Sequence, residues 1–293
     1  MPVTTNNQGA DYQPDKQAPW HHAWVAVDQT SDPDWFVRFL DATRAKKLKK
    51  AEADPHTYFA YLDVREGHHV LELGCGTGDF LGPLARLVGA SGRIVGLDNS
   101  ETMIREARRR VEGSGLPIEF CVGDAHDLDF APNTFNRCYA NTLFQHLSDP
   151  RKALSEVIRV TQLGGRIAIT DQDWETQIIA ADDHIVTRKI MNFFCDSIPN
   201  GWMGRYLPGL FREFGLHNIV IAPATFTSTD FSWTEQTLGL RTMVERAQKA
   251  GAVSMDEGEA WLSDLETRSR QGRFFASFTA FRVQGDKPYP VYL

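Results

Sequence analysis

The most constraining feature of this sequence is the alternation of short apolar runs with helix-length segments between residues 55 and 174. Helix starts are readable between the runs, because Ser100 precedes one apolar helical face and Asp149 with Pro150 precedes another. Parallel neighbouring strands need crossover connections, so the alternation predicts an α/β fold with a doubly wound, parallel sheet. The predicted strands of this core cover residues 69–73, 93–97, 118–122, 135–140 and 166–170.

The segments that flank this core follow other patterns. Asp32 and Pro33 predict a helix start, so residues 1–54 are expected to form an N-terminal extension with a helix. Residues 175–293 are expected to add helical cap insertions and the last two strands of the same sheet, which gives seven strands in all. The elements predicted there are a helical stretch over 175–215, strands over 217–222 and 274–283, and two helices that begin at the capping-box patterns Ser232 to Glu235 and Ser254 to Glu257.

Composition excludes several classes of protein. The 42% hydrophobic content excludes a disordered chain, and no apolar run approaches the roughly 18 residues of a membrane span. The net charge of −7 argues against nucleic acid as the main partner, and the polar N-terminal segment indicates no secretory signal. The basic run over residues 44–50 is interpreted as a solvated helix face rather than a binding patch.

Cysteines and histidines show no spacing typical of a metal site. The four cysteines form no CxxC pair, and we interpret them as small packing residues in a reducing cytoplasm. The adjacent pairs His21-His22 and His68-His69 would diverge on any regular element, and no HExxH pattern accompanies them. We therefore expect a cytoplasmic protein without a bound metal.

The glycine-rich stretch over residues 72–78 carries the clearest chemical signal. An apolar strand leads into Gly74, Gly76 and Gly78 at alternate positions, and a helix is expected directly afterwards. Glycine lets the backbone turn sharply and a ligand come close, while the helix N-terminus offers unpaired N–H groups. Asp98 ends the next strand, where an acid can accept hydrogen bonds from both hydroxyls of a ribose.

The chemistry of this turn favours one kind of nucleoside ligand. A dinucleotide fingerprint would have glycine where Asp79 stands, and no Gly-Lys-Ser/Thr sequence marks a phosphate-binding loop. Acidic side chains at Glu72 and Asp79 disfavour a pyrophosphate and favour a ligand with an ammonium group. The best match is a cofactor with an adenosine ribose, an amino acid tail and a net positive charge.

Over residues 66–172 the sequence resembles the class I S-adenosylmethionine-dependent methyltransferases, most closely the group with ubiquinone/menaquinone C-methyltransferases and many natural-product methyltransferases. The glycine turn and Asp98 carry the resemblance, together with residues 123–125 after the third strand, 141–147 after the fourth and 162–166 before the fifth. The resemblance implies a Rossmann-like methyltransferase sheet and S-adenosylmethionine as the cofactor. The cofactor-binding residues that it implies are Glu72, Gly74, Cys75, Gly76, Gly78, Asp98, Asn99, Asp124, Ala125 and Asn141.

Polar residues after the fourth and fifth strands are the candidates for catalysis. Related small-molecule enzymes often have His-His where this chain has Gln145 and His146, and an acid at the position of Asp171. We therefore expect Asp171 and His146 to be catalytic, with the larger contribution from Asp171; the alternatives are a solvated loop acid and a packed histidine. A general base is needed only if the acceptor enters protonated. The residues expected to contact the acceptor are Trp24, Gln145, Asp173, Trp174 and Trp202.

The predicted function is methyl transfer to an oxygen or carbon of a small, apolar or aromatic metabolite, in quinone-like or secondary metabolism. No Asn/Asp-Pro-Pro-Tyr/Phe sequence follows the fourth strand, which argues against nucleic-acid bases as acceptors. The alternatives are a small-molecule N-methyltransferase and a protein that keeps the cofactor without transferring the methyl group. We expect no nucleic-acid or membrane partner, and a monomer or a homodimer.

Overall fold

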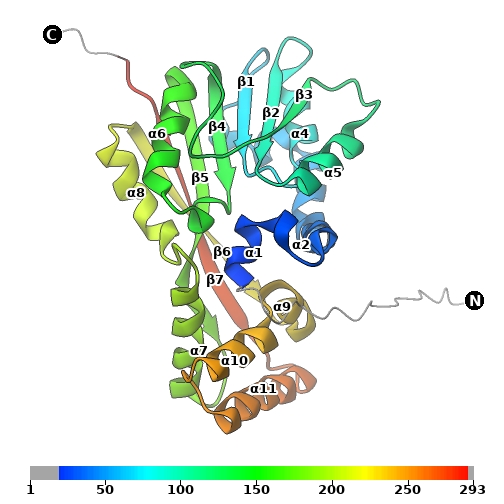
Figure 1. Ribbon diagram of the computed structural model, residues 1–293, viewed down its shortest axis with the longest axis vertical. Coiled ribbons are helices and arrows are strands. Elements are labelled where there is room, and N and C mark those ends of the chain that lie inside the picture. The colour runs from blue at the N-terminus through cyan, green and yellow to red at the C-terminus, as the bar shows by residue number, and fades with distance from the viewer. Residues whose placement is uncertain (1–19, 290–293) are drawn as a thin grey trace, which may run out of the picture.

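The computed structural model describes residues 20–289 and has a seven-stranded sheet at the centre of its upper lobe (Figure 1). The strand order is β3-β2-β1-β4-β5-β7-β6, in which β1 to β5 are parallel and β7 is antiparallel to both of its neighbours. This confirms the doubly wound, seven-stranded arrangement expected from the sequence. The strands are β1 (His69–Leu73), β2 (Arg93–Asp98), β3 (Ile118–Val122), β4 (Phe135–Asn141), β5 (Thr161–Ile179), β6 (His217–Ser228) and β7 (Ala276–Asp286).

Helices cover both faces of the sheet in the upper lobe of Figure 1. On one face α6 (Pro150–Val160) and α8 (Met203–Glu213) pack on the sheet, and on the other α4 (Leu81–Val88) and α5 (Glu101–Val111) do so. The predicted starts of α5 and α6 are confirmed, because the Ser100 hydroxyl accepts from the Met103 N–H and the Asp149 carboxylate accepts from the Lys152 N–H. Short elements complete this lobe: α3 (Pro55–Tyr58), η2 (Ala60–Leu62) and η3 (Phe144–His146).

The lower lobe is a helical cap with its own hydrophobic cluster, to which Trp174, Trp261 and Phe274 contribute. Its helices are α7 (His184–Ser197), α9 (Phe231–Leu238), α10 (Leu240–Lys249) and α11 (Met255–Arg270). Three helices thus lie between β6 and β7, where the sequence predicted two. The capping box at Ser254 is present, but the predicted one at Ser232 is wrong, because the N-cap of α9 is Asp230.

Strand β5 is much longer than predicted. It continues to Ile179 and pairs with β7 along most of that length, so it crosses the expected boundary at residue 174 and joins both lobes. Its second half reads as a polar loop in the sequence, yet Asp171, Asp173 and Gln177 are buried there. The strand continues through this polar stretch because it pairs with β7, a contact that the local sequence pattern does not reveal.

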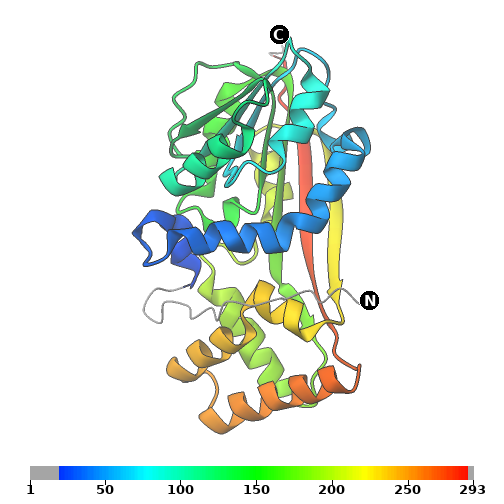
Figure 2. The same ribbon diagram turned by 90° about the vertical axis from the view of Figure 1, so that its right-hand side faces the viewer.

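The N-terminal extension lies between the two lobes (Figure 2). It consists of α1 (Trp20–Val25), η1 (Val27–Gln29) and α2 (Pro33–Ala53), and α2 begins at Asp32 as predicted. The Asp28 carboxylate accepts hydrogen bonds from the Ser100 hydroxyl and from the N–H groups of Glu101 and Thr102. The extension is thereby attached to the first turn of α5, directly after β2.

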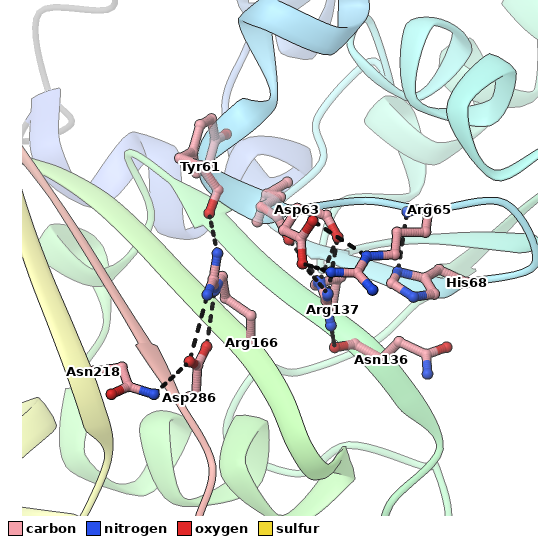
Figure 3. A network of polar contacts seen from close by, with 10 residues as sticks. Tyr61, Asp63, Arg65, His68, Asn136, Arg137, Arg166, Asn218 and Asp286 are labelled. Carbon is pink, nitrogen blue, oxygen red and sulfur yellow. Dashed lines mark hydrogen bonds and ion pairs between the residues drawn. The ribbon is translucent and has the colours of Figure 1, made fainter.

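An arginine network holds the side of the sheet near the amino ends of β4 and β5 (Figure 3). The Arg137 guanidinium donates to the carbonyls of Leu62 and Asp63 at 2.6 and 2.8 Å, and to the Asp63 carboxylate at 3.1 Å. Arg166 pairs with Asp286 of β7 at 2.8 Å and donates to the Tyr61 carbonyl. The network therefore ties the segment before β1 to three strands.

No helix in the described part of the chain is long and apolar enough to cross a membrane. Likewise, no group of three or more His, Cys, Asp or Glu side chains in residues 20–289 is arranged to hold a metal ion.

Candidate functional site

A cavity of about 510 Å³ lies where the core, the N-terminal extension and the helical cap meet. It begins at the glycine turn and Asp98, at the carboxyl ends of the parallel strands, and extends to Phe194 of α7 and Trp233 of α9. Ligands of open α/β sheets bind at this edge. The sequence-predicted residues that line the cavity are Trp24, Gly74, Gly76, Asp98, Asn99, Asp124, Ala125, Asn141, Gln145, His146 and Trp174.

The glycine turn has the left-handed backbone that its sequence predicts. Gly74, Gly76 and Gly78 have φ of 66°, 56° and 70°, and a Cβ at Gly78 would lie 2.8 Å from the Phe120 ring. The Gly76 N–H donates to the Asp98 carboxylate at 2.8 Å. Burial raises the pKa of Asp98, which is only partly offset by its backbone hydrogen bonds. The turn and the ribose acid therefore form one unit with a carboxylate at the cavity.

Three predicted cofactor residues lie outside the lining of the cavity. The Cys75 side chain is buried in the core, and Gly78 packs against Phe120, so both support the turn on the side away from the cavity. Glu72 is buried as well; burial raises its pKa to about 8, and its Oε2 has no hydrogen-bond partner among the described residues. An ammonium group near this carboxyl would favour its charged form, which fits a cofactor with an amino acid tail.

The remaining cofactor candidates connect the strand ends to the extension. Asn99 donates from its amide to the Val25 carbonyl at 2.8 Å, while Asp124 accepts from the His126 backbone N–H at 2.9 Å. Ala125 and Asn141 complete this part of the lining. The donor set therefore fits an adenosine: a ribose acid, small residues at the turn and polar groups after the third and fourth strands.

The basic run on α2 corrects one sequence interpretation. Only part of the run is a solvated face, because Arg44 and Lys47 line the cavity. Together with Leu40 and Thr43 they repeat at the 3–4-residue spacing of one helix face, a signal that the neighbouring lysines obscured. Arg44 Nη1 lies 3.6 Å from the carboxylate of Asp79, which also pairs with Arg110 at 2.5 Å. The acidity of the turn is thus largely neutralised.

A hydrogen-bond chain determines the protonation of His146. The indole N–H of Trp174 donates to Gln145 Oε1 at 2.8 Å, so the amide nitrogen of Gln145 faces His146 Nε2 at 2.9 Å. An amide NH₂ only donates, which makes Nε2 the acceptor and assigns the ring proton to Nδ1. Burial lowers the pKa of His146 to about 4, and Trp24 stacks on its ring with 6.4 Å between centroids. The imidazole is neutral, and its usual basic nitrogen is occupied.

Asp171 does not reach the cavity. Its carboxyl is fully buried and accepts a hydrogen bond from the Phe144 N–H at 2.9 Å, which holds the η3 turn that carries Gln145 and His146. Burial raises the pKa of Asp171 to about 8. We therefore correct the expectation that Asp171 is catalytic, because from its position it can influence the reaction only through this turn.

Two predicted acceptor residues also lie elsewhere. Asp173 is buried but forms an ion pair with Arg205, and Trp202 is 39% exposed next to the same arginine. Neither side chain lines the cavity, so the prediction that Asp173 and Trp202 contact the acceptor is wrong. The far end of the cavity is aromatic instead: Phe226 stacks on Phe278, whose ring centroid lies 5.2 Å from that of Trp174.

Comparisons with known proteins agree with this geometry. Residues 65–208 match the family model described as "Methyltransferase domain". A demethylmenaquinone methyltransferase of Bacillus cereus is 29% identical over 181 residues, which cover 56% of this chain and 76% of that protein. The chain belongs to the class I S-adenosylmethionine-dependent methyltransferases. Its cofactor is accordingly S-adenosylmethionine.

Two further likenesses extend beyond the core of this methyltransferase. A 37.1 kDa uncharacterized protein in transposon Tn4556 of Streptomyces fradiae is 37% identical over 245 residues, 83% of this chain and 67% of that protein. The structure of the YcgJ protein from Bacillus subtilis is similar with a TM-score of 0.56 at 19% identity, covering 80% of this chain and 97% of that one. The latter likeness shows the shared fold.

Proposed function

We propose that this methyltransferase transfers the methyl group to an oxygen or carbon of a small, apolar or aromatic metabolite. The observation that carries the proposal is one continuous cavity that runs from the glycine turn and Asp98 to the aromatic side chains of Trp174, Phe226 and Phe278. A cavity of this size suits a small ligand, and mostly apolar linings are typical of small-molecule sites. The similarity to a demethylmenaquinone methyltransferase supports the same class of acceptor.

The cofactor end follows from the groups that line it. S-adenosylmethionine supplies an electrophilic methyl group on a sulfonium when it is bound. In our proposal Asp98 accepts from the ribose hydroxyls, Gly74 and Gly76 allow the close approach, and Asp124 lies beside the base. Arg44, which lines the cavity beside Gly76, provides a positive charge for a carboxylate tail.

The acceptor end provides positioning and exclusion of water rather than a strong base. His146 is neutral, its Nε2 is engaged by Gln145, and its Nδ1 is buried without a partner among residues 20–289. Asp171 acts indirectly in this proposal, because it accepts a hydrogen bond from the η3 turn that carries Gln145 and His146. In-line placement of a nucleophile is the main requirement for a methyl donor that is already activated.

The decisive experiment uses S-adenosylmethionine with a deuterated methyl group and a metabolite extract. We expect a product that gains the labelled methyl on an oxygen or carbon, identified by mass and fragmentation. The Asp98→Ala variant is the control, because its weaker cofactor binding should reduce labelling when S-adenosylmethionine is not saturating. Label found on nitrogen would overturn the proposed acceptor atom, and no labelled product from any extract would overturn methyl transfer to a free small molecule.

We retain two expectations from the sequence as parts of this proposal. The enzyme acts in a reducing cytoplasm, which is consistent with its free cysteines, and it is a monomer or a homodimer. Light scattering of the purified protein distinguishes these two states.

A further inference from the structure

Lys47 occupies an unusual position in the acceptor end of the cavity. It lies on the inward face of α2, one turn beyond the residues that approach Gly76, which are Leu40 and Arg44. Its ammonium lies 4.2 Å from the centroid of the Phe226 ring on β6. The charge is therefore directed away from the cofactor turn and toward the aromatic wall.

The charges around the cavity are unevenly distributed. Asp98 and Asp124 line the cofactor end, where Asp98 is bound by backbone N–H groups and Asp124 by His126. Arg44 has Asp79 within 3.6 Å, whereas the described part of the chain gives Lys47 no carboxylate partner. Lys47 is thus a positive charge at the acceptor end without an anionic partner within residues 20–289.

A partly buried ammonium without a partner is costly, and burial accordingly lowers the pKa of Lys47 to about 8. The attraction to the face of Phe226 offsets only part of this cost, since cation–π contacts are weaker than ion pairs to a desolvated anion. A ligand anion that reaches Lys47 would complete the site.

We infer that the acceptor of this methyltransferase is an anion, a planar aromatic or polycyclic acid whose carboxylate or acidic oxygen pairs with Lys47 while its rings lie against Phe226, Phe278 and Trp174. This inference rests on the proposed function, because it assigns a substrate class to the same cavity. It makes Lys47 a specificity-determining residue that binds the charged group, and it involves no bond formation by the lysine.

The test uses two isosteric probes, 2-naphthoate and neutral 2-naphthamide, titrated by calorimetry into protein saturated with S-adenosylhomocysteine. We expect wild-type protein to bind the acid more tightly than the amide. Lys47→Met should weaken binding of the acid about tenfold or more, and binding of the amide less than twofold. Lys47→Arg should keep most of the preference for the acid, and Lys47→Gln repeats the loss with a polar side chain.

The matched control is Lys46→Met, a charge removed from the exposed face of the same helix. It should leave both affinities unchanged. Three results would each overturn the inference: no binding of 2-naphthoate to wild-type protein at millimolar concentration, equal losses for acid and amide, or a loss of S-adenosylhomocysteine affinity in Lys47→Met, which would assign the lysine to the cofactor. Because the probes report binding without turnover, this outcome is separate from that of the labelling experiment.

Discussion

The two ends of the strands in the central sheet differ in whether their polar side chains find hydrogen-bond partners within the chain. Near the amino ends of β4 and β5, the buried Arg137 and the partly buried Arg166 both donate to carbonyls and carboxylates, so each guanidinium has several partners. At the carboxyl ends, Glu72 Oε2, Asp171 Oδ1 and His146 Nδ1 are buried without a partner among the described residues. The polar groups at the amino ends are satisfied within the chain, whereas these three atoms at the carboxyl ends have no hydrogen-bond partner among the described residues.

The pKa shifts follow the same division. Burial alone would raise the pKa of Asp63 and of Asp286, but the adjacent arginines outweigh it and lower both values. For Asp98 and Asp171 at the other edge burial prevails, and the pKa is raised. The difference reflects both burial and partners: Asp63 and Asp286 are only partly buried and pair with arginines, whereas Asp171 is fully buried and both Asp171 and Asp98 accept hydrogen bonds from backbone N–H groups.

The largest expected effect is a loss of stability at the amino-end edge. Arg137→Ala leaves the carbonyls of Leu62 and Asp63 without their donor, so the free energy of unfolding should fall by about 3 kcal/mol in urea titrations. Cofactor affinity of the folded fraction should change little. Arg86→Ala, at an exposed position, should stay within about 0.5 kcal/mol of wild type; an equally small effect of Arg137→Ala would contradict the comparison.

Asp98→Ala, at the carboxyl ends of the strands, should weaken cofactor binding and have a smaller effect on stability than Arg137→Ala. Removal of the acid leaves the ribose hydroxyls and the Gly76 N–H unpaired, which costs about 1–3 kcal/mol, or roughly ten- to a hundredfold in affinity for S-adenosylhomocysteine. Calorimetry measures this, with Asp98→Asn as the milder variant. An unchanged dissociation constant in a folded protein would show that the ribose is held elsewhere.

The raised pKa of Asp171 predicts that the stability of the protein depends on pH. Its pKa of about 8 exceeds the usual value near 4, so between these limits the folded state keeps a proton that the unfolded state releases. The free energy of unfolding of wild type should therefore fall as pH rises from about 4 to 8, relative to that of Asp171→Asn. Exposed Asp129→Asn is the control and should track wild type. A constant difference between wild type and Asp171→Asn across this range would refute the raised pKa.

The hydrogen-bond chain at the cavity can be reversed by one substitution. In Gln145→Glu the carboxylate can accept from both the Trp174 indole and the imidazole, so the ring proton of His146 should move from Nδ1 to Nε2. Nitrogen chemical shifts of His146 report the tautomer directly. Gln145→Met, which removes both bonds, should lower kcat/KM roughly fivefold without altering cofactor affinity. Finding Nε2–H in the wild type would refute the assigned chain.

The smallest effect is expected for Trp202, which lies outside the cavity although its sequence context suggests a binding residue. Trp202→Ala should change kcat and KM by less than about twofold, because its ring contacts Arg205 and Tyr206 at the surface. Trp174→Ala is the matched comparison and should impair turnover strongly. Similar losses in the two variants would place Trp202 back in the site.

Local patterns predicted the core well. The ends of β1 and β3 agree with the predicted ranges residue for residue, because each is a short, mainly apolar run with polar or glycine-containing segments on both sides. The prediction failed where burial comes from distant partners: the second half of β5 is polar, and the Asp28 cap on α5 joins residues more than seventy positions apart. The inward face of α2 was missed because exposed lysines alternate with the cavity-lining Arg44 and Lys47.

The length of β5 has a consequence for how the cavity can change size. At a rise of about 3.3 Å per residue, its 19 residues extend roughly 60 Å, and β7 is hydrogen-bonded to it in both lobes. The register shifts between Asp173 and Ile178, but pairing resumes beyond the shift, so separating the lobes would break these hydrogen bonds. We therefore expect the depth of the cavity to vary little. Related enzymes with longer or shorter ligands would then differ in side chains such as Phe194 and Leu238, which line the cavity on the side of the helical cap.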